Sequence, residues 1–236
     1  MKPFPTLKGV KFYLCGGAVR DIFLGHAPKD RDFIMITDLS LDDIADRLVA
    51  SGYIIYQIRP EFQTILCRKD HENVDLSLPR KECKYSDLRH PDSTERVKDL
   101  ESDSTRRDFT INAMYMNEDG NVYDFHGGTQ DIGAKIIRCV GSPRERFKED
   151  PIRILRAIRL AVTLGFDIHD DTFDEMIFHR MLLLSPSLSL DRMKNEINRA
   201  LAVNPHRTLE LLDSIDFFTI AKLRDENFRI ELVNRK

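Results

Sequence analysis

The sequence predicts a mixed α/β head that is followed by an all-helical segment. Two observations carry this expectation. Short apolar runs alternate with turn residues as far as about residue 140, and helical periodicity dominates from Arg144 onward. The chain has 236 residues, of which 42% are hydrophobic and 32% are charged, so it can bury a sizeable core. We therefore expect two domains, residues 1–140 and residues 141–236.

Composition and charge exclude several classes of protein. No stretch approaches the roughly 20 apolar residues of a membrane span, and the N-terminus lacks a secretory signal, so we expect a cytoplasmic protein with no membrane partner. A net charge of -3 and a pI near 6.2 exclude a protein that coats nucleic acid by bulk charge. The four cysteines show no metal-binding spacing, and we expect reduced core thiols at Cys15, Cys67, Cys83 and Cys139.

In the head, strands are predicted where aliphatic and aromatic residues gather between turn residues, and helices where apolar residues recur every three to four positions. Residues 109–116 are predicted as a short helix or a strand. The charged stretch 79–105 lacks periodicity and is predicted to be a mobile loop. The other predicted strands cover residues 11–15, 32–36, 53–58, 64–68, 73–78 and 122–125, and the predicted helices cover residues 18–24 and 41–51.

The second segment is predicted to be built from helices alone. At its end, Phe228, Ile230 and Leu232 alternate with other residues, which fits a strand, a frayed tail or a contact with another chain. The predicted helices cover residues 151–164, 171–184, 190–202 and 206–220.

Two aspartates, Asp30 and Asp32, open a predicted strand. Residues i and i+2 of a strand point the same way, so both carboxylates should share one side. Such a pair is tolerated when divalent cations neutralise it, and two Mg²⁺ ions about 4 Å apart serve in-line phosphoryl or nucleotidyl transfer. Taken alone, the pair is more often a solvated strand end. Asp75, between apolar residues on another predicted strand, is either a third carboxylate of the cation site or an edge residue that faces water.

Gly16 and Gly17 stand at a predicted junction between a strand and a helix. Without Cβ atoms, their backbone N–H groups can approach a triphosphate, and the N-terminus of the following helix favours negative charge. A lone pair of glycines is usually only a turn. However, the order of strand, Gly-Gly, helix with Arg20, and paired aspartates on the next strand is that of the DNA polymerase β type of nucleotidyltransferase.

A second group of polar residues lies on the predicted helix 152–164, which is apolar except for Arg153, Arg156 and Arg159. Their spacing predicts one stripe that faces a polar cleft or a bound anion, although a solvated face is the commoner explanation. Asp150, one turn before Arg153, supplies acceptors where arginine supplies donors. This pair matches the Watson–Crick edges of cytosine and adenine, so it could select CTP and ATP over GTP and UTP.

Four strings in one order carry a resemblance to a known family. They are GGAVRD at 16–21, DRD at 30–32, RRDFTINAM at 106–114 and EDPIRILR at 149–156. They resemble the class II tRNA nucleotidyltransferases, which are the CCA-adding enzymes, and their bacterial poly(A) polymerase relatives. The resemblance runs from about Val10 to Leu201. It implies a DNA polymerase β-like head, a helical neck and, because the chain ends at Lys236, a shortened C-terminus.

The resemblance also implies roles for individual residues. Asp30 and Asp32 would hold the metal ions. Arg107 and Asp108 would contact the ribose, where the 2′-hydroxyl distinguishes NTP from dNTP. The remaining nucleotide-binding residues would be Gly16, Gly17 and Arg20 near the triphosphate, Asn112, the base-reading pair Asp150 and Arg153, and Arg156 and Arg159.

Further segments match the family in the same way. The stretch 79–105, with Arg89-His90-Pro91, resembles a flexible segment that helps the pocket to switch from CTP to ATP. Residues 124–131 resemble a hinge. Residues 190–201, with Arg192 and Glu196, resemble a helix that supports the nucleotide pocket. One departure is Arg31, which replaces an apolar residue and is expected to point away from the metal ions.

The implied activity is template-independent addition or repair of the terminal CCA of tRNA from CTP and ATP, with release of pyrophosphate and with two Mg²⁺ ions. Two alternatives stay open: an enzyme restricted to A addition, C addition or poly(A) synthesis, and a catalytically weak RNA-binding subunit. The partner would be tRNA or another RNA 3′ end. Three explanations of the shortened C-terminus stay open: a naturally minimal chain, a protein partner or a homodimer that replaces the C-terminal domains, and action on short acceptor stems or other RNA 3′ ends.

Overall fold

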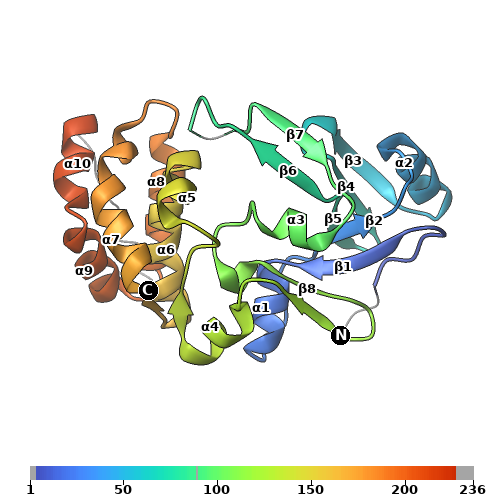
Figure 1. Cartoon of the computed structure of the whole chain (residues 1–236), viewed down its shortest axis with the longest axis horizontal. Coiled ribbons are helices and arrows are strands. Elements are labelled where there is room, and N and C mark those ends of the chain that lie inside the picture. Colours follow the sequence, from blue (N-terminus) through green and yellow to red (C-terminus); the bar gives the residue numbers. More distant parts are fainter. Residues whose placement is uncertain (1–3, 89, 227–236) are drawn as a thin grey trace. The chain divides into compact units, whose positions relative to one another are not determined.

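The computed structural model describes residues 4–88 and 90–226, which form two compact units (Figure 1). Of the described residues, 4–83 and 93–132 form the first unit, and 84–88, 90–92 and 133–226 form the second. The first is a mixed α/β unit and the second is mainly helical, so the predicted fold class is confirmed. The functional division predicted at residue 140 stays a prediction.

A seven-stranded sheet forms the centre of the first unit. Its strands lie in the order β3-β4-β5-β2-β1-β8-β9. Among the described residues, β2 and β5 make its only parallel pairing. The stretch 109–116, predicted as a short helix or a strand, forms a 3-10 turn followed by the short strand β8 (Met114–Met116). The other predicted strands are present within one residue of their expected bounds: β1 Lys11–Cys15, β2 Asp32–Ile36, β3 Ile54–Arg59, β4 Thr64–Lys69, β5 Glu72–Ser77 and β9 Val122–Asp124.

Helix α2 (Leu41–Ala50) contacts β3 and β4 and packs beside them in Figure 1. It begins at Ser40, whose hydroxyl accepts the amide N–H of Asp43 at 3.1 Å, while the Asp43 carboxylate accepts the Ser40 amide at 3.3 Å. This capping box stabilises a helix by about 1 kcal/mol. The helix buries Ile44, Ala45 and Leu48 and so leaves the opposite face of the sheet for other elements.

Helix α1 (Gly17–Phe23) follows β1 through a turn that only glycine adopts easily. Gly16 has a φ of 71°, in the left-handed region, and its amide donates to the Met114 carbonyl at 3.2 Å. A side chain on Gly16 would also approach the guanidinium of Arg107. The predicted junction of strand, glycine pair and helix is therefore confirmed as local structure.

Residues 124–131, expected to be a hinge, contain the start of helix α4 (Gly128–Ala134). The Asp124 carboxylate accepts the amides of Gly128 at 2.9 Å and Thr129 at 2.8 Å. A Cβ atom on Gly128 would lie 2.3 Å from the carbonyl oxygen of Thr110, in the 3-10 turn Thr110–Asn112. Glycine at this position therefore lets the helix approach that turn closely.

The prediction of a mobile loop at 79–105 is wrong. This stretch forms the hairpin β6 (Arg80–Cys83) and β7 (Ser93–Arg96) and the short helix α3 (Leu100–Ser104). Several of its charged residues pair with other charged residues of the first unit, as the ion pair between Arg80 and Glu82 shows. Within this hairpin Cys83 is exposed, so its prediction as a core thiol is also wrong, whereas Cys15, Cys67 and Cys139 are buried. Arg89 lies outside the described residues.

Within its described residues, the second unit has one short parallel strand pair besides its helices, β10 (Ile136–Ile137) and β11 (Asp167–Ile168), which corrects the all-helical expectation. The helix predicted at 206–220 is two helices, because Asp216 takes a left-handed conformation with φ 56°. The expectation for Phe228, Ile230 and Leu232 lies outside the described residues. The helices are α5 Pro143–Glu149, α6 Ile152–Leu164, α7 Asp170–His179 with a 3-10 turn at Arg180–Leu184, α8 Leu190–Leu201, α9 Pro205–Ser214 and α10 Phe217–Arg224.

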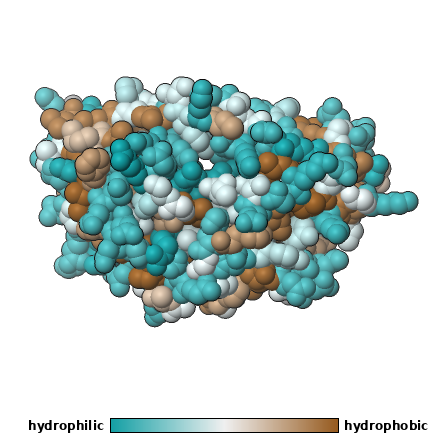
Figure 2. Space-filling view, viewed as in Figure 1, coloured by the Kyte–Doolittle hydropathy of each residue, from teal (hydrophilic) through white to brown (hydrophobic). Residues whose placement is uncertain are grey.

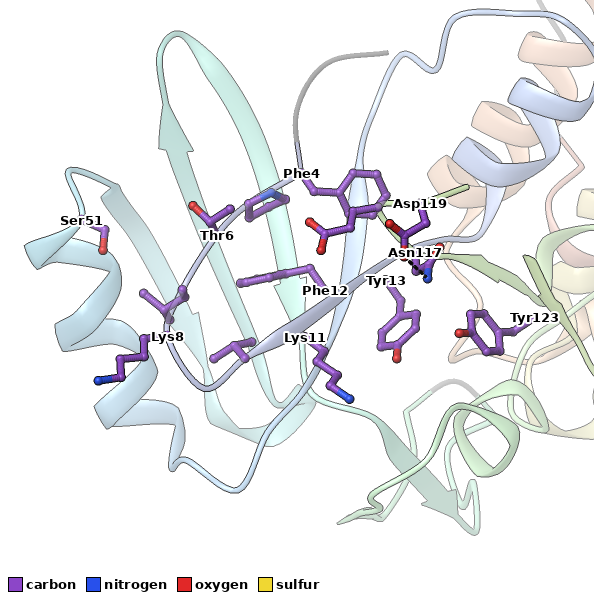
Figure 3. A pocket seen from close by; sticks show the side chains of 14 residues that line it. Phe4, Thr6, Lys8, Lys11, Phe12, Tyr13, Ser51, Asn117, Asp119 and Tyr123 are labelled. Atoms are coloured by element: carbon purple, nitrogen blue, oxygen red, sulfur yellow. Dashed lines mark hydrogen bonds between the residues drawn. The ribbon is translucent and has the colours of Figure 1, made fainter. Parts of the chain in front are cut away.

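The surface in Figure 2 is hydrophilic over most of the visible face, with hydrophobic residues gathered over α10. Within residues 4–88 and 90–226, no helix combines the length and apolar character needed to cross a bilayer. A cavity of about 620 Å³ lies in the first unit beside Phe4, Tyr13 and Tyr123 (Figure 3). None of the predicted site residues lines this cavity.

Candidate active site

Three predicted carboxylates lie at neighbouring positions of the first unit. Asp32 opens β2 and is paired across the parallel ladder with Asp75 of β5. Asp30 precedes Asp32 by two residues, and its charge acts on both other carboxylates. The structure therefore pairs Asp32 with the third carboxylate, whereas Asp30 lies in a bend before β2 begins, so the expectation that both aspartates of the pair belong to one strand is wrong.

The electrostatics of this cluster oppose full ionisation. Partial burial raises the pKa of Asp32 to about 6, and the charges of Asp75 and Asp30 add to the rise while Arg107 opposes it. The pKa of Asp75 is also raised, first by burial and then by Asp30, and Arg59 counteracts this. A bound cation would remove the repulsion between these groups.

Beside the carboxylates lies a recess of about 300 Å³ with a basic lining. Asp32 and Asp75 share this lining with Thr64 and Leu66 of β4. Four guanidinium groups also line it, and they offer the donors that phosphate oxygens accept. They belong to Arg59, Arg80, Arg106 and Arg107.

The basic lining is organised by Asp103, a fully buried carboxylate that sequence reasoning missed. Its oxygens accept hydrogen bonds from Arg106 Nε at 2.9 Å, from an Arg107 guanidinium nitrogen at 3.2 Å and from the Tyr115 hydroxyl at 2.8 Å. Burial would raise the pKa of Asp103, but the two guanidiniums, the Arg80 amide and Tyr115 outweigh it and lower the pKa to about 2. The spacing of Asp103 from the two arginines, three and four residues, is the signal that could have identified it.

A second network joins the predicted nucleotide-binding residues around α1. Arg20 donates to the Asn112 side-chain oxygen at 2.7 Å and to the Asp21 carboxylate at 2.7 Å. Asn112 in turn donates to Asp108 at 3.3 Å, and Asp108 accepts the amide of Phe109. Arg20, Asn112 and Asp108, three of the head residues that the family resemblance implied, therefore lie in one connected set of hydrogen bonds.

The carboxylates fit a magnesium site as partial ligands. No group of three or more His, Cys, Asp or Glu side chains in the described parts of the chain is arranged to hold a metal ion unaided. Mg²⁺ usually takes only one or two carboxylates and completes its octahedron with water and substrate phosphates. Asp30, Asp32 and Asp75 supply the hard oxygen donors that such a shell needs.

In the second unit, Asp150 lies outside helix α6 and ends α5. One of its carboxylate oxygens accepts the Ile152 amide at 3.2 Å, and the other accepts Arg192 of α8 at 2.9 Å. Asp150 and Arg153 therefore stand one turn apart, with Asp150 held by α8.

Two arginines of the α6 stripe, Arg153 and Arg159, bond to carboxylates of the same unit. Arg153 is buried, donates to the Arg146 carbonyl at 3.1 Å and forms an ion pair with Glu149. Arg159 forms an ion pair with Glu196 of α8. Elsewhere, Arg31 pairs with Glu72 at 3.0 Å and covers the ring of Phe33, on the side of the sheet opposite Asp32.

Comparison with known proteins finds one matching family and several relatives of this chain. Residues 12–138 match the family described as the poly A polymerase head domain. The chain is 37% identical over 206 residues to the CCA-adding enzyme of Bacillus subtilis, covering 85% of this chain and 50% of that protein. It is 33% identical over 237 residues to the CCA-adding enzyme of Streptococcus agalactiae, covering 97% of this chain and 57% of that protein.

Two solved structures have a fold similar to that of this chain. The Bacillus stearothermophilus CCA-adding enzyme in complex with CTP superposes with a TM-score of 0.75 at 31% identity, over 86% of this chain and 48% of that one. A tRNA nucleotidyltransferase with a primer tRNA and an incoming ATP analog gives 0.72 at 31% identity, over 94% of this chain and 61% of that one. The chain spans about half the length of the curated relatives that it matches. With more than half of its residues inside that match, the chain belongs to the poly A polymerase head domain family.

Proposed function

We propose that this chain extends RNA 3′ ends without a template, and that it adds or repairs the terminal CCA of tRNA from CTP and ATP with release of pyrophosphate. The observation that carries the proposal is the pairing of Asp32 with Asp75 beside a recess lined by arginines. Relatives with the name CCA-adding enzyme support the choice of product. The RNA, CTP and ATP would be its substrates.

In the proposed reaction, the RNA 3′-oxygen forms a bond to the α-phosphorus while the bond from that phosphorus to the β-phosphate oxygen breaks. Asp75, whose pKa is raised, accepts the proton of the 3′-hydroxyl. Asp30 and Asp32 would hold two Mg²⁺ ions, which supply charge neutralisation at the attacking and leaving oxygens when bound. The charge of the leaving pyrophosphate is neutralised by Arg106, which Asp103 holds in place.

Other residues of the head would bind the rest of the nucleotide. The Gly16-Gly17 turn and Arg20 bind the triphosphate, and the turn leaves room for it because neither residue has a Cβ atom. Asp108 and Arg107 contact the ribose. Asn112, which bonds both Arg20 and Asp108, links these two groups.

Base choice is assigned to the second unit. Asp150 accepts the exocyclic amino group of cytosine or adenine, and Arg153 donates to the ring nitrogen beside it. Arg192 and Glu149 orient the pair through their ion pairs. Arg156 and Arg159 complete the nucleotide contacts. A guanine or uracil edge would leave these polar groups unpaired, which disfavours GTP and UTP.

The test is direct product sequencing. The chain is incubated with Mg²⁺, one NTP at a time, and tRNA transcripts that end before the CCA, after the first C or after the second C. We expect C on the first two transcripts, A on the third, and no product without Mg²⁺ or with the Asp32→Asn variant. Incorporation of A alone, of C alone or of a poly(A) tail would show that the chain is an enzyme restricted to that product. No incorporation at all would favour the alternative of a catalytically weak RNA-binding subunit.

A further inference from the structure

We propose that Tyr56 and Arg68 form a stacking platform for the 3′-terminal base of the RNA, on the same face of the sheet as the catalytic carboxylates. The inference rests on the proposed function, because it assumes that an RNA 3′ end is extended at Asp32 and Asp75. Neither residue lines the recess described above, and neither belongs to the strings that carry the family resemblance.

Tyr56 occupies an irregular position of β3, the edge strand of the sheet. The pairing of β3 with β4 shifts between Ile55 and Gln57, so Tyr56 is the extra residue of a β-bulge. Its side chain is 51% exposed, which is unusual for a large aromatic residue in a strand. Bulges redirect side chains and are common beside active sites.

The ring of Tyr56 is held in one orientation. Its hydroxyl donates to the Asn73 side-chain oxygen at 3.0 Å, and Asn73 belongs to β5. Because β4 lies between β3 and β5, the side chain must reach across β4 to make this bond. Arg68 of β4 places its guanidinium carbon 5.6 Å from the ring centroid. An aromatic ring fixed in this way loses little freedom when a base stacks on it.

Strand register connects this platform to the carboxylates. Asn73 and Asp75 lie two residues apart on β5 and therefore point to the same face, about 7 Å from each other along the strand. On β4, Arg68 pairs with Asn73, and Leu66, which lines the recess, pairs with Asp75. The platform is thus one row of side chains away from the place where the 3′-hydroxyl must react.

Apart from the carboxylates of the proposed cation site, the charges on this face suit a nucleic-acid strand. The alternation of β3 and β4 puts Arg59 and Arg68 on this face, while Glu72 of β5 points to the opposite side and pairs with Arg31. Aromatic stacking beside arginines that contact phosphates is the usual composition of sites for single-stranded nucleic acid. Charge complementarity therefore favours RNA over a protein as the occupant.

The main measurement is steady-state CTP incorporation into a tRNA transcript that ends after the first C. For Tyr56→Ala and Arg68→Ala we expect the KM for the transcript to rise about tenfold, while the KM for CTP stays unchanged. Tyr56→Leu keeps apolar bulk at the bulge without a flat ring, and we expect the same rise. Tyr56→Phe keeps the ring but loses the bond to Asn73, so we expect a rise of about two- to threefold.

Two control variants match these changes on the opposite face. Lys69→Ala removes the cation next to Arg68 in the chain, whose ammonium lies 4.9 Å from the ring centroid of Tyr53. Val49→Ala shortens a side chain of α2 that is 59% exposed. Both should leave the KM values for the transcript and for CTP unchanged.

A modified RNA separates stacking from a structural effect. The same transcript is prepared with a 3′-terminal nucleotide that lacks its base but keeps its 3′-hydroxyl. With the wild-type chain, the KM for this RNA should rise about as much as Tyr56→Ala raises it for the normal transcript. With Tyr56→Ala, loss of the base should cause no further rise, because the two changes remove one interaction.

Distinct results would overturn this inference and the proposed function. If the wild-type chain incorporates no nucleotide, the proposed function fails. The platform is wrong and the function stands if the wild-type chain is active but Tyr56→Leu and Arg68→Ala keep the wild-type KM for the transcript. The same conclusion follows if removal of the terminal base raises the KM of Tyr56→Ala by the same factor as it raises the KM of the wild-type chain. A change in the mass of the particle in solution for Tyr56→Leu, with an unchanged KM for the transcript, would instead assign the edge strand to a second copy of the chain.

Discussion

Asp32 of β2 and Asp75 of β5 stand opposite each other in a parallel strand pair. Neighbouring strands are about 4.8 Å apart, so the backbone holds the two carboxylates close together although their charges repel. The pKa values of both residues are raised as a result of burial and of neighbouring carboxylates. Backbone hydrogen bonding therefore supports an arrangement that the side chains alone would not adopt.

Replacement of Asp32 by Asn should abolish nucleotide addition without loss of stability. The folded-state pKa of Asp32 is about 6, above its ordinary value of 3.8, so its ionisation lowers the stability of the fold as the pH rises from about 4 to 6. At pH 7.5 we expect the variant to melt at the wild-type Tm or higher, and this difference should shrink at pH 4.5. Turnover and Tm are measured on the same samples.

Asp46→Asn, an exposed change on α2, is the control and should keep wild-type turnover. Wild-type turnover in the Asp32→Asn variant would remove this carboxylate from the active centre.

Loss of the Asp103 carboxylate should destabilise the first unit strongly. Asp103→Asn leaves two arginines without their buried counter-charge, and we expect the free energy of unfolding at pH 7 to fall by about 3–5 kcal/mol. The folded-state pKa of about 2 is below the ordinary 3.8, so the charge of Asp103 stabilises the fold above pH 4. That contribution, about 2 kcal/mol, is lost as the pH falls from about 4 to 2.

Urea denaturation at pH 7 and pH 3 measures this effect. The difference between wild type and Asp103→Asn should narrow at the lower pH, while Glu101→Gln, an exposed change on the same helix, should match wild type at both. An equal difference at both pH values would mean that Asp103 is not ionised in the folded chain.

Ribose recognition should weaken when Asp108 is replaced by Ala. A buried group that reads the 2′-hydroxyl contributes about 1–3 kcal/mol, so the ratio of CTP to dCTP incorporation should fall about 5- to 100-fold. Arg107→Ala would also remove bonds to Asp103 and Tyr115, and Arg107→Lys is therefore the cleaner companion variant. Wild-type ratios in both variants would place ribose recognition elsewhere.

Exchange of the base-reading pair should invert base preference only when its neighbours are exchanged as well. Asp150→Arg with Arg153→Asp brings like charges against Arg192 and Glu149, so this double variant should lose stability and incorporate every NTP poorly. Addition of Arg192→Glu and Glu149→Lys restores opposite charges. The fourfold variant should then incorporate GTP or UTP in preference to CTP and ATP.

Single-nucleotide incorporation with each NTP measures that preference, beside a Tm for every variant. A folded fourfold variant that still prefers CTP and ATP would show that other groups read the base.

The sequence was most informative where local physics decides the structure. β1 and β2 match their predicted bounds because their apolar residues lie between strong turn residues, and Gly16 has the left-handed φ that its place in the sequence indicates. The helix break at Asp216 could not be predicted, since nothing in the local pattern distinguishes a left-handed aspartate from a helical one.

The wrong prediction of a mobile loop at residues 79–105 has a different cause. The charges of Arg80, Glu82 and Asp103 suggested a solvated loop, but their partners are charges within the same unit. Whether a charged residue faces water or a counter-charge depends on tertiary contacts, which periodicity does not record. The family resemblance indicated Arg107 but not Asp103, the carboxylate that holds it, although the spacing of Asp103 from Arg106 and Arg107 was a usable signal.

The parallel pairing of β2 with β5 also bears on the order of folding. Asp32 and Asp75 are separated by a long stretch of chain, whereas β3, β4 and β5 join their sequence neighbours through short turns. Local hairpins form before distant pairings, because closing a long loop costs more conformational entropy. The hairpins of β3 to β5 should therefore form first, and the carboxylates should meet only when this sheet docks against β2. A partly folded chain would then lack a functional cation site.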